Sequence, residues 1–335
     1  MTTRPTRLST DIDFDRDGKQ VSNIFMAWSR NASAYGEVQI PIACIRNGPG
    51  KTMLYTAGTH GDEYEGQVAL LDLIRALEPG EIRGRVIIVP AANFPAAMNG
   101  SRLSPYDNGN LNRAHPGDPD GGPTAQIAYY IGQTLVPMAD AYHDLHAGGS
   151  SLDYLPFVSS HLSGNAELDQ RQLAAAKAFA PPMVVIGKSS DDRLAQRAAH
   201  KRGIIAFGGE FGGRGAVTIS GVKLVATGIR NMLHFLGILP DWQPPKPKAP
   251  TRLMQIAGRR YFVYAPANGL FEPAVELGDE VIAGQKAGRL HFIEDPMRPP
   301  IEPTFAIAGT VVCKRVQGRC ERGDCLAHLA TPYAG

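Results

Sequence analysis

The sequence lacks the features of an exported, membrane-spanning or nucleic-acid-binding protein. Its 34 basic and 32 acidic residues nearly balance, and a net charge of +2 gives no strongly basic surface for nucleic acid or anionic lipid. No apolar run approaches the roughly 18 residues needed to span a bilayer. Residues 1–19 are polar and contain no apolar core of a secretory signal. We therefore expect a cytoplasmic protein without nucleic-acid or membrane partners.

Cysteine is also scarce, and its spacing is uninformative. The four cysteines are Cys44, Cys313, Cys320 and Cys325, and they form no C-x-x-C pair. Three of them lie near the C-terminus, and a structural metal or a disulfide there is the alternative to free thiols. The sequence spacings between these cysteines fit no common zinc motif. We expect reduced, structural thiols, as is usual in the cytosol.

The middle of the chain alternates between strand-like and helix-like segments. Apolar runs typical of buried strands occur at residues 53–57, 85–90, 139–145, 183–186 and 203–207. Helical periodicity occupies residues 65–77, 123–135, 166–179, 192–202 and 222–239, with Asp192 as an expected cap. This alternation predicts an α/β fold: a mixed, mostly parallel sheet with helices on both faces.

A length of 335 residues indicates one large domain and a smaller one. We expect a β extension (1–50) packed on a catalytic domain (51–240), then a Pro-rich linker (241–250). Residues 251–335 contain short β-like runs between glycines, which predict a small all-β barrel-sandwich domain. That pattern resembles lipoyl and biotinyl domains, but residues 294–298 lack the lysine that carries the prosthetic group. We therefore expect neither modification.

Three residues at expected strand ends form a candidate metal site. His60 and Glu63 follow the strand at 53–57, and His146 follows the strand at 139–145. The carboxyl ends of parallel strands meet at one edge of a sheet, where ligands bind. Two imidazoles and one carboxylate are a ligand set of catalytic zinc with an open position. We predict one zinc ion per chain and a hydrolytic reaction.

Four further residues are candidates for the surrounding chemistry. Asp144 is either a partner that orients a ligand imidazole or an ordinary polar residue at a strand end. The irregular segment 93–122 contains Arg102 and Arg113, which are either solvated loop charges or ligands of a substrate carboxylate. Glu210 lies among four glycines and is either an exposed turn residue or a general acid/base beside the metal.

Four motifs together resemble the succinylglutamate desuccinylase/aspartoacylase family. They are Gly-Thr-His-Gly-Asp-Glu at 58–63, Asn-Leu-Asn-Arg at 110–113, Asp-Leu-His at 144–146 and Glu210 in its glycine-rich setting. The resemblance covers nearly the whole chain. Members of this family are zinc amidohydrolases with the metallocarboxypeptidase fold and a C-terminal β domain that helps to wall the active site.

The resemblance implies a role for each candidate residue. His60, Glu63 and His146 match the zinc ligands, and Glu210 matches the general acid/base. Arg102 matches the arginine that polarises the scissile carbonyl. Asn112 and Arg113 match the pair that holds the substrate carboxylate, which implies a small N-acyl amino acid as substrate.

Within the family the chain is most similar to the bacterial N-alpha-acetyl-2,4-diaminobutyrate deacetylases of ectoine breakdown. This resemblance rests on length, linker and N-terminal segment. Further substrate-binding groups of aspartoacylase are not matched; the candidate substitutes are Arg214, Tyr261 and Tyr264. A cationic substrate side chain would need an acidic partner, for which the candidates are Asp107, Asp153 and Glu272. The acyl group, the amino acid and a homo-oligomeric state are left open.

Three alternatives stand beside this hypothesis. The first is succinylglutamate desuccinylase or aspartoacylase activity on the same site. The second is a metallocarboxypeptidase that cleaves peptides, although the extra β domain should narrow the cleft. The third is a non-catalytic binding protein for a carbohydrate or a partner, in which the C-terminal β domain is the working part.

Overall fold

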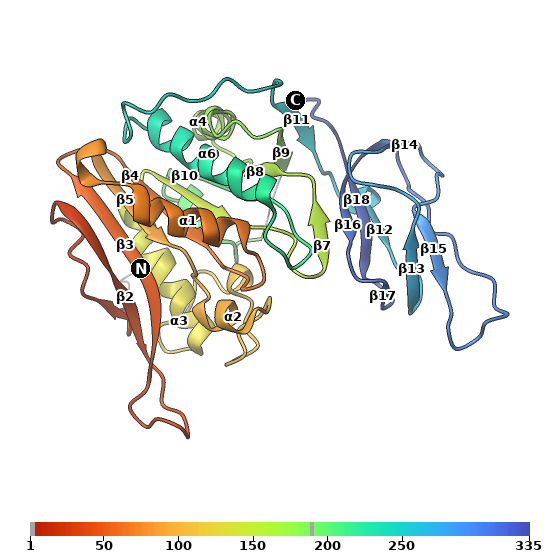
Figure 1. The fold of residues 1–335 in the computed structure, drawn as a ribbon, viewed down its shortest axis with the longest axis horizontal. Coiled ribbons are helices and arrows are strands. Elements are labelled where there is room, and N and C mark those ends of the chain that lie inside the picture. The colour runs from red at the N-terminus through yellow and green to blue at the C-terminus, as the bar shows by residue number, and fades with distance from the viewer. Residues whose placement is uncertain (1–3, 188–190) are drawn as a thin grey trace.

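The computed structural model describes residues 4–187 and 191–335, which are arranged around one long mixed sheet (Figure 1). The strands of the N-terminal and central parts are β1 (Ser9–Thr10), β2 (Gly18–Ala27), β3 (Glu37–Asn47), β4 (Thr52–Ala57), β5 (Gly84–Val89), β6 (Ala141–Leu145), β7 (Leu152–Tyr154), β8 (Phe157–His161), β9 (Met183–Gly187) and β10 (Ile205–Glu210). The helices are α1 (Glu65–Ala76), α2 (Phe94–Asn99), α3 (Pro123–Tyr130), α4 (Ala166–Ala178), α5 (Ala195–His200) and α6 (Ile219–Phe235).

The central strands follow the order β1-β2-β3-β5-β4-β6-β10-β8-β9. The pairs β5–β4, β4–β6 and β6–β10 are parallel, whereas β8 runs antiparallel to β10 and parallel to β9. The predicted mixed sheet is confirmed. Because β4, β6 and β10 point the same way, their carboxyl ends share one edge.

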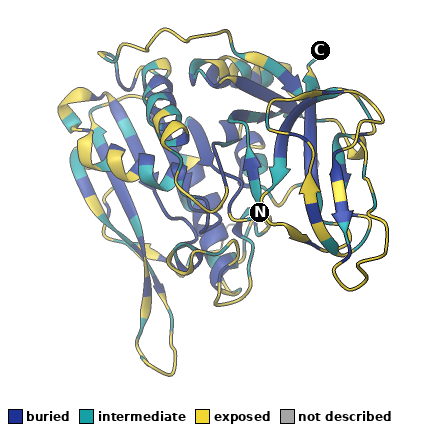
Figure 2. Ribbon diagram, turned by 45° about the vertical axis from the view of Figure 1, so that its right-hand side comes forward, coloured by how far each residue is buried: buried dark blue, intermediate teal, exposed yellow. Residues whose placement is uncertain are grey.

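Helices cover both faces of this sheet, as predicted. Met53 and Tyr55 of β4 point into the core beneath α1, α4 and α6, whereas Leu54 points into the core beneath α3 and α5. The buried Tyr55 hydroxyl donates a hydrogen bond to the Ile229 carbonyl of α6 at 2.8 Å, so its burial leaves no donor unpaired. Figure 2 shows the result: buried central strands and exposed residues on the outer sides of the helices.

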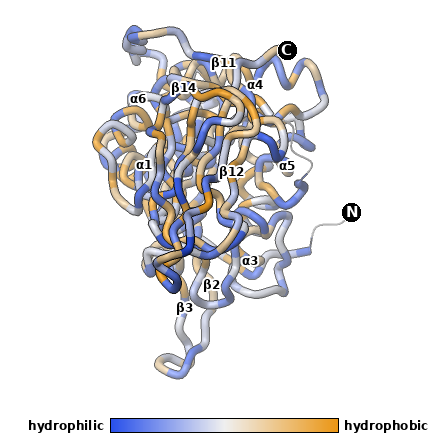
Figure 3. Tube along the Cα trace, turned by 90° about the vertical axis from the view of Figure 1, so that its right-hand side faces the viewer, coloured by the Kyte–Doolittle hydropathy of each residue, from blue (hydrophilic) through white to orange (hydrophobic). Residues whose placement is uncertain are grey.

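The N-terminal residues extend the sheet as a hairpin. β2 pairs with β3 along its whole length, and β3 adds antiparallel to β5. The turn between β2 and β3 projects from the body of the molecule, as two views show (Figure 1, Figure 3). The division of the chain into domains at residues 50, 240 and 250 stays a prediction.

The C-terminal part consists of β-strands and one 3₁₀ turn, Arg259–Tyr261. Its strands are β11 (Arg252–Gln255), β12 (Phe262–Tyr264), β13 (Gly269–Pro273), β14 (Glu280–Val281), β15 (Gly288–His291), β16 (Gly309–Arg315), β17 (Arg319–Cys320) and β18 (Cys325–Pro332). β15, β13 and β17 form a separate antiparallel sheet, while β11 joins β9 to β18 and thereby continues the long sheet. The described strands contain no closed barrel. Phe271, Leu290 and Phe305 belong to the core of this region.

Local predictions differ from the structure at a few elements. The helix expected at 192–202 is shorter, and its cap is Leu194 without a side-chain hydrogen bond, so the predicted Asp192 cap is wrong. Asp192 instead pairs with Lys201 at 3.1 Å. The helix expected at 222–239 runs from Ile219 to Phe235 and is followed by Gly237 at a φ of 74°. β7 and β8 were not predicted.

Two further sequence-based expectations concern membranes and thiols. Among the described residues, no helix combines the length and the apolar composition needed to cross a membrane. All four cysteines are free thiols, as expected.

Candidate metal centre and active site

The turn between β4 and α1 delivers His60 and Glu63. Gly58 adopts a φ of +64°, a conformation that L side chains rarely adopt. A Cβ atom at Gly61 would lie 2.0 Å from the Ala96 carbonyl, so only glycine fits there. The Gly61 amide donates to the Ser101 carbonyl at 2.9 Å. This turn is therefore packed directly against the segment that carries Arg102.

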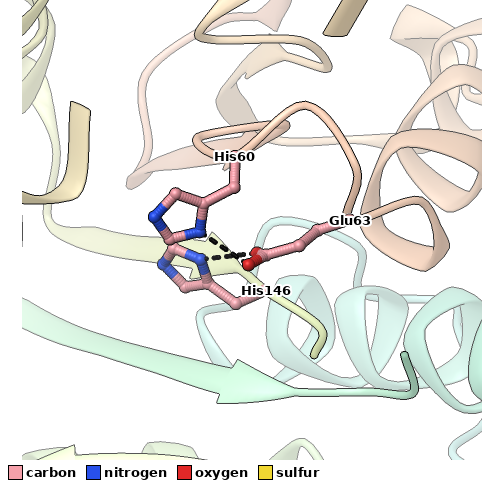
Figure 4. Close-up of side chains that lie close together, drawn as sticks. All are labelled: His60, Glu63 and His146. Atoms are coloured by element: carbon pink, nitrogen blue, oxygen red, sulfur yellow. Dashed lines mark hydrogen bonds and ion pairs between the residues drawn. The ribbon is translucent and has the colours of Figure 1, made fainter. Parts of the chain in front are cut away.

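His60, Glu63 and His146 converge, as the sequence predicted (Figure 4). His60 Nδ1 lies 2.6 Å from Glu63 Oε1, and His146 Nδ1 lies 2.9 Å from Glu63 Oε2. The three side chains are buried, and their candidate ligand atoms all lie within 4.8 Å of one another. The same nitrogen of each ring thus faces one shared point.

The electrostatics of this cluster suit a cation. Burial alone would raise the pKa of Glu63, but the adjacent His60 and His146 outweigh it and hold that pKa well below its usual range. Burial opposes protonation of His146, yet Asp144 and Glu63 raise the pKa of its imidazole. An ionised carboxylate and two imidazole nitrogens around one point fit a divalent ion such as zinc.

The imidazoles of His60 and His146, the two candidate ligands, each have an oxygen near Nε2. His146 Nε2 lies 2.9 Å from Asp144 Oδ2, and Asp144 also accepts hydrogen bonds from Thr56 and Thr59 at 2.7 and 2.9 Å. His60 Nε2 lies 3.2 Å from Asn110 Oδ1. Asp144 is thus close enough to the His146 ring for the orienting role, which stays a prediction. The sequence singles out Asn110 only as part of the Asn-Leu-Asn-Arg motif.

The arginine candidates lie at the exposed side of the cluster. Arg102 Nη1 lies 3.3 Å from His60 Nδ1 and 3.5 Å from Glu63 Oε1. Asn112 and Arg113 belong to the 3₁₀ turn Leu111–Arg113, which directly follows Asn110. Partial burial, together with the nearby charge of Arg102, lowers the pKa of Arg113, and Asp191 at 3.6 Å opposes this. Arg102 is therefore in direct contact with the candidate ligand atoms, and the turn with Asn112 and Arg113 begins next to Asn110, which contacts His60.

Glu210 ends β10 beside His146. The two residues form an isolated parallel bridge, in which the His146 amide donates to the Gly209 carbonyl and the Phe211 amide donates to the His146 carbonyl, both at 3.0 Å. Burial, reinforced by the charge of Glu63, raises the pKa of Glu210 well above its ordinary value. Its Oε2 is buried without a hydrogen-bond partner. A carboxyl with a raised pKa beside a metal site is suited to accept and return a proton.

The C-terminal strands are attached to the loop that follows His146. β16 pairs with β7, where Cys313 lies opposite Tyr154. The hydroxyl of the half-buried Tyr154 lies 3.3 Å from His328 Nε2 of β18. Glu210 and Cys313 are both close enough to contribute to the raised pKa of Tyr154, after burial as the main cause. The all-β part thus lies near the candidate acid/base.

The weaker candidates from the sequence have other partners. Asp153 Oδ2 accepts from Arg214 Nε at 2.5 Å, which joins β7 to the loop after Glu210. The remaining contacts are those of Asp107 with Thr124, Glu272 with Arg289 and His291, Tyr261 with Thr331, and Tyr264 with Arg259. Glu272 lies on the separate three-stranded sheet. These contacts provide ordinary structural roles for all six residues.

Comparison with known proteins identifies the class. Residues 49–236 match the family described as the succinylglutamate desuccinylase/aspartoacylase catalytic domain. The chain therefore belongs to the succinylglutamate desuccinylase/aspartoacylase family and is an amidohydrolase.

Individual relatives match over nearly their full lengths. The chain is 38% identical over 328 residues to N-alpha-acetyl-L-2,4-diaminobutyric acid deacetylase of Halomonas elongata, covering 98% of this chain and 96% of that protein. A succinylglutamate desuccinylase/aspartoacylase structure from Rhodobacter sphaeroides has a TM-score of 0.93 at 41% identity, over 98% of this chain and 100% of that one. The product-bound ectoine utilization protein EutE (DoeB) from Ruegeria pomeroyi has a TM-score of 0.94 at 37% identity, with the same coverage.

Proposed function

We propose that this protein is a zinc-dependent deacetylase of N-alpha-acetyl-2,4-diaminobutyrate, which releases acetate and diaminobutyrate. The observation that carries the chemistry is the convergence of His60, Glu63 and His146 within 4.8 Å. Full-length similarity to the Halomonas deacetylase and to the ectoine utilization protein supports the substrate and a place in ectoine breakdown. We place the enzyme in the cytoplasm.

In this proposal His60, Glu63 and His146 hold one zinc ion. When bound, zinc supplies Lewis acidity that polarises a carbonyl and acidifies water. Glu210 accepts a proton from the attacking water and returns it to the leaving amine nitrogen. Its position beside His146 and its raised pKa support this role.

The remaining side chains bind and orient the substrate. Arg102, half-exposed beside the ligand atoms, donates hydrogen bonds to the acyl oxygen as negative charge develops there. Asn112 and Arg113 hold the carboxylate of the amino acid, for which the guanidinium fork is suited. Asp144 orients the His146 ring. A free carboxylate and a small acyl group are therefore the expected substrate features.

A release assay tests the proposal. The purified protein, loaded with zinc, is given N-alpha-acetyl-diaminobutyrate, N-acetylaspartate, N-succinylglutamate and a peptide with a free carboxyl end. We expect the highest kcat/KM for the acetylated diamino acid and little cleavage of the peptide. A higher kcat/KM for N-acetylaspartate or N-succinylglutamate would overturn the substrate assignment.

Desuccinylase or aspartoacylase activity is the second candidate. It is favoured by the similarity to the Rhodobacter protein, whose name carries both activities. The same assay distinguishes it. All of these substrates share the amide and the carboxylate, so differences in kcat/KM report the preferred acyl group and amino acid. A non-catalytic binding function predicts no product from any substrate and no retained metal.

A further inference from the structure

Asn110 is the first residue of the turn that carries Asn112 and Arg113. It occupies the N-cap position of the 3₁₀ segment Leu111–Arg113 without a side-chain capping bond, and it is half-buried. Its Oδ1 lies 3.2 Å from Nε2 of His60, a ring that is only 2% exposed. One side chain therefore connects the substrate-binding turn to a metal ligand.

The contact with Asn110 favours one tautomer of the His60 imidazole. His60 Nδ1 faces Glu63 at 2.6 Å, on the side where the ligand atoms converge. A neutral imidazole that offers a lone pair at Nδ1 must carry its proton on Nε2. The Asn110 carbonyl oxygen is an acceptor at that position, so it favours the tautomer that metal binding requires.

Asn110 is itself held in place by the preceding residues. Asp107 accepts hydrogen bonds from the Gly109 amide at 3.0 Å and from the amide and hydroxyl of Thr124 at 2.8 and 2.7 Å. The Ser104 amide donates to the Gly109 carbonyl at 3.0 Å. The segment that presents Asn110 is thus anchored to the first turn of α3, which restricts where its side chain can point.

The two imidazoles differ in the group that lies at Nε2. Asp144 supplies a carboxylate at His146 Nε2, whereas His60 receives a neutral amide. An amide fixes the ring without adding a third negative charge to the buried Asp144 and Glu63.

We propose that Asn110 is a positioning residue for His60 and that it couples metal binding to the order of the Asn112–Arg113 turn. This inference rests on the proposed zinc site. Loss of the acceptor releases the His60 ring, so the metal is held less tightly. In return, the metal-bound ring stabilises the turn that binds the substrate carboxylate.

Zinc affinity tests the proposal without relying on activity. The zinc Kd is measured by competition with a chromophoric chelator for the wild type, Asn110→Ala, Asn110→Asp and the matched control Asn165→Ala, which removes an asparagine acceptor from the N-cap of α4. We expect Asn110→Ala to weaken binding by about 10- to 100-fold, the usual effect of removing such a partner. Asn110→Asp keeps an acceptor and should bind zinc more tightly than Asn110→Ala. Asn165→Ala should leave the zinc Kd unchanged.

Two spectroscopic readouts separate positioning from general destabilisation. In the zinc-loaded wild type, ¹H–¹⁵N spectra should show a slowly exchanging Nε2 proton on His60, and Asn110→Ala should make that exchange fast. Zinc should slow amide hydrogen exchange in residues 107–113 of the wild type but not of Asn110→Ala. Should that variant fail to fold, Asn110→Gln, which displaces the same amide, is expected to weaken zinc binding as well.

The outcomes distinguish this inference from the proposed function. A wild type that binds zinc together with an Asn110→Ala variant of equal affinity would overturn the inference and leave the zinc enzyme intact. Wild-type affinity in Asn110→Gln would overturn it in the same way. A wild type that binds no zinc would overturn both.

Discussion

The candidate metal-ligand cluster (His60, Glu63 and His146) and the arginine pair (Arg102 and Arg113) lie at the same edge of the sheet but are built differently. The ligand side chains are 3–7% exposed, whereas those of Arg102 and Arg113 are 47% and 43% exposed. The candidate ligands follow strands of the central sheet, whereas the arginines lie after α2 in the segment between β5 and α3, which contains only short helical turns. The side chains of the buried cluster are therefore held in one geometry by packing, whereas the two arginines are partly exposed on a less regular segment.

Removing the metal ion disables the buried cluster but leaves the exposed arginines in place. We expect it to have the largest effect on activity. Chelation should abolish amide hydrolysis, because the cluster without a cation cannot polarise the substrate carbonyl. Adding about one equivalent of zinc should restore the activity, measured as acetate release alongside elemental analysis. Full activity in protein shown to be free of metal would contradict the zinc assignment.

Glu210→Gln tests the proton carrier beside the cluster. Turnover should fall by about 10²–10⁴, the usual contribution of a general acid/base, while zinc content and substrate affinity stay the same. The control is Glu294→Gln in an exposed C-terminal turn, which should keep wild-type turnover. Near wild-type turnover in Glu210→Gln would show that another group moves the proton.

Arg113→Ala tests one of the two partly exposed arginines. KM should rise by about 10- to 150-fold with kcat nearly unchanged, because a charged hydrogen bond is worth about 1.5–3 kcal/mol and acts in both ground and transition states. Arg113→Lys should recover part of the affinity, since it keeps the charge but loses the planar fork. Arg171→Ala, at an exposed position of α4, serves as the control. A fall in kcat without a change in KM would argue against a carboxylate anchor.

Thr59→Val removes one of the hydrogen bonds that hold Asp144 next to the buried cluster. Asp144 would lose the Thr59 donor but keep Thr56 and His146, so the metal-free protein should lose only about 1 kcal/mol of unfolding free energy in urea. Zinc affinity should fall as well, because Asp144 orients His146. Thr310→Val removes a buried hydroxyl that donates to Glu280 in the C-terminal strands, and it should alter stability without altering zinc affinity. Equal zinc affinity in both variants would show that the Thr59 hydroxyl does not help Asp144 to orient His146.

The metal-ligand cluster could be predicted from sequence because its members follow clear strands. Residues 53–57 are a mostly apolar, fully buried run, and His60 and Glu63 come three and six residues after its end. β7 and β8 could not be predicted in the same way. They are short, Pro156 separates them, and Ser159 and Ser160 interrupt the apolar pattern of β8. Their pairing depends on distant segments, since Val158 lies opposite Val184 and Asp153 lies opposite Lys314.

Side-chain partnerships were the least predictable part of the site. The contact between Asn110 and His60 joins two motifs that are far apart in the sequence. Asp153 looked available to a cationic substrate, but the fold places Arg214 against it. Such choices depend on tertiary packing, which composition and spacing do not encode.

The strand β18 has a consequence for recombining this enzyme with its relatives. It pairs with β11, β12 and β16, and β11 lies parallel to β9, so one hydrogen-bonded ladder runs from the α/β part into the C-terminal strands. A chimera that takes the C-terminal strands from another family member must therefore exchange β11 and β18 together. A junction in residues 241–250, before β11, keeps the β11–β18 pair from one parent, and the strands that must match across the two parents are then β9 with β11 and β7 with β16.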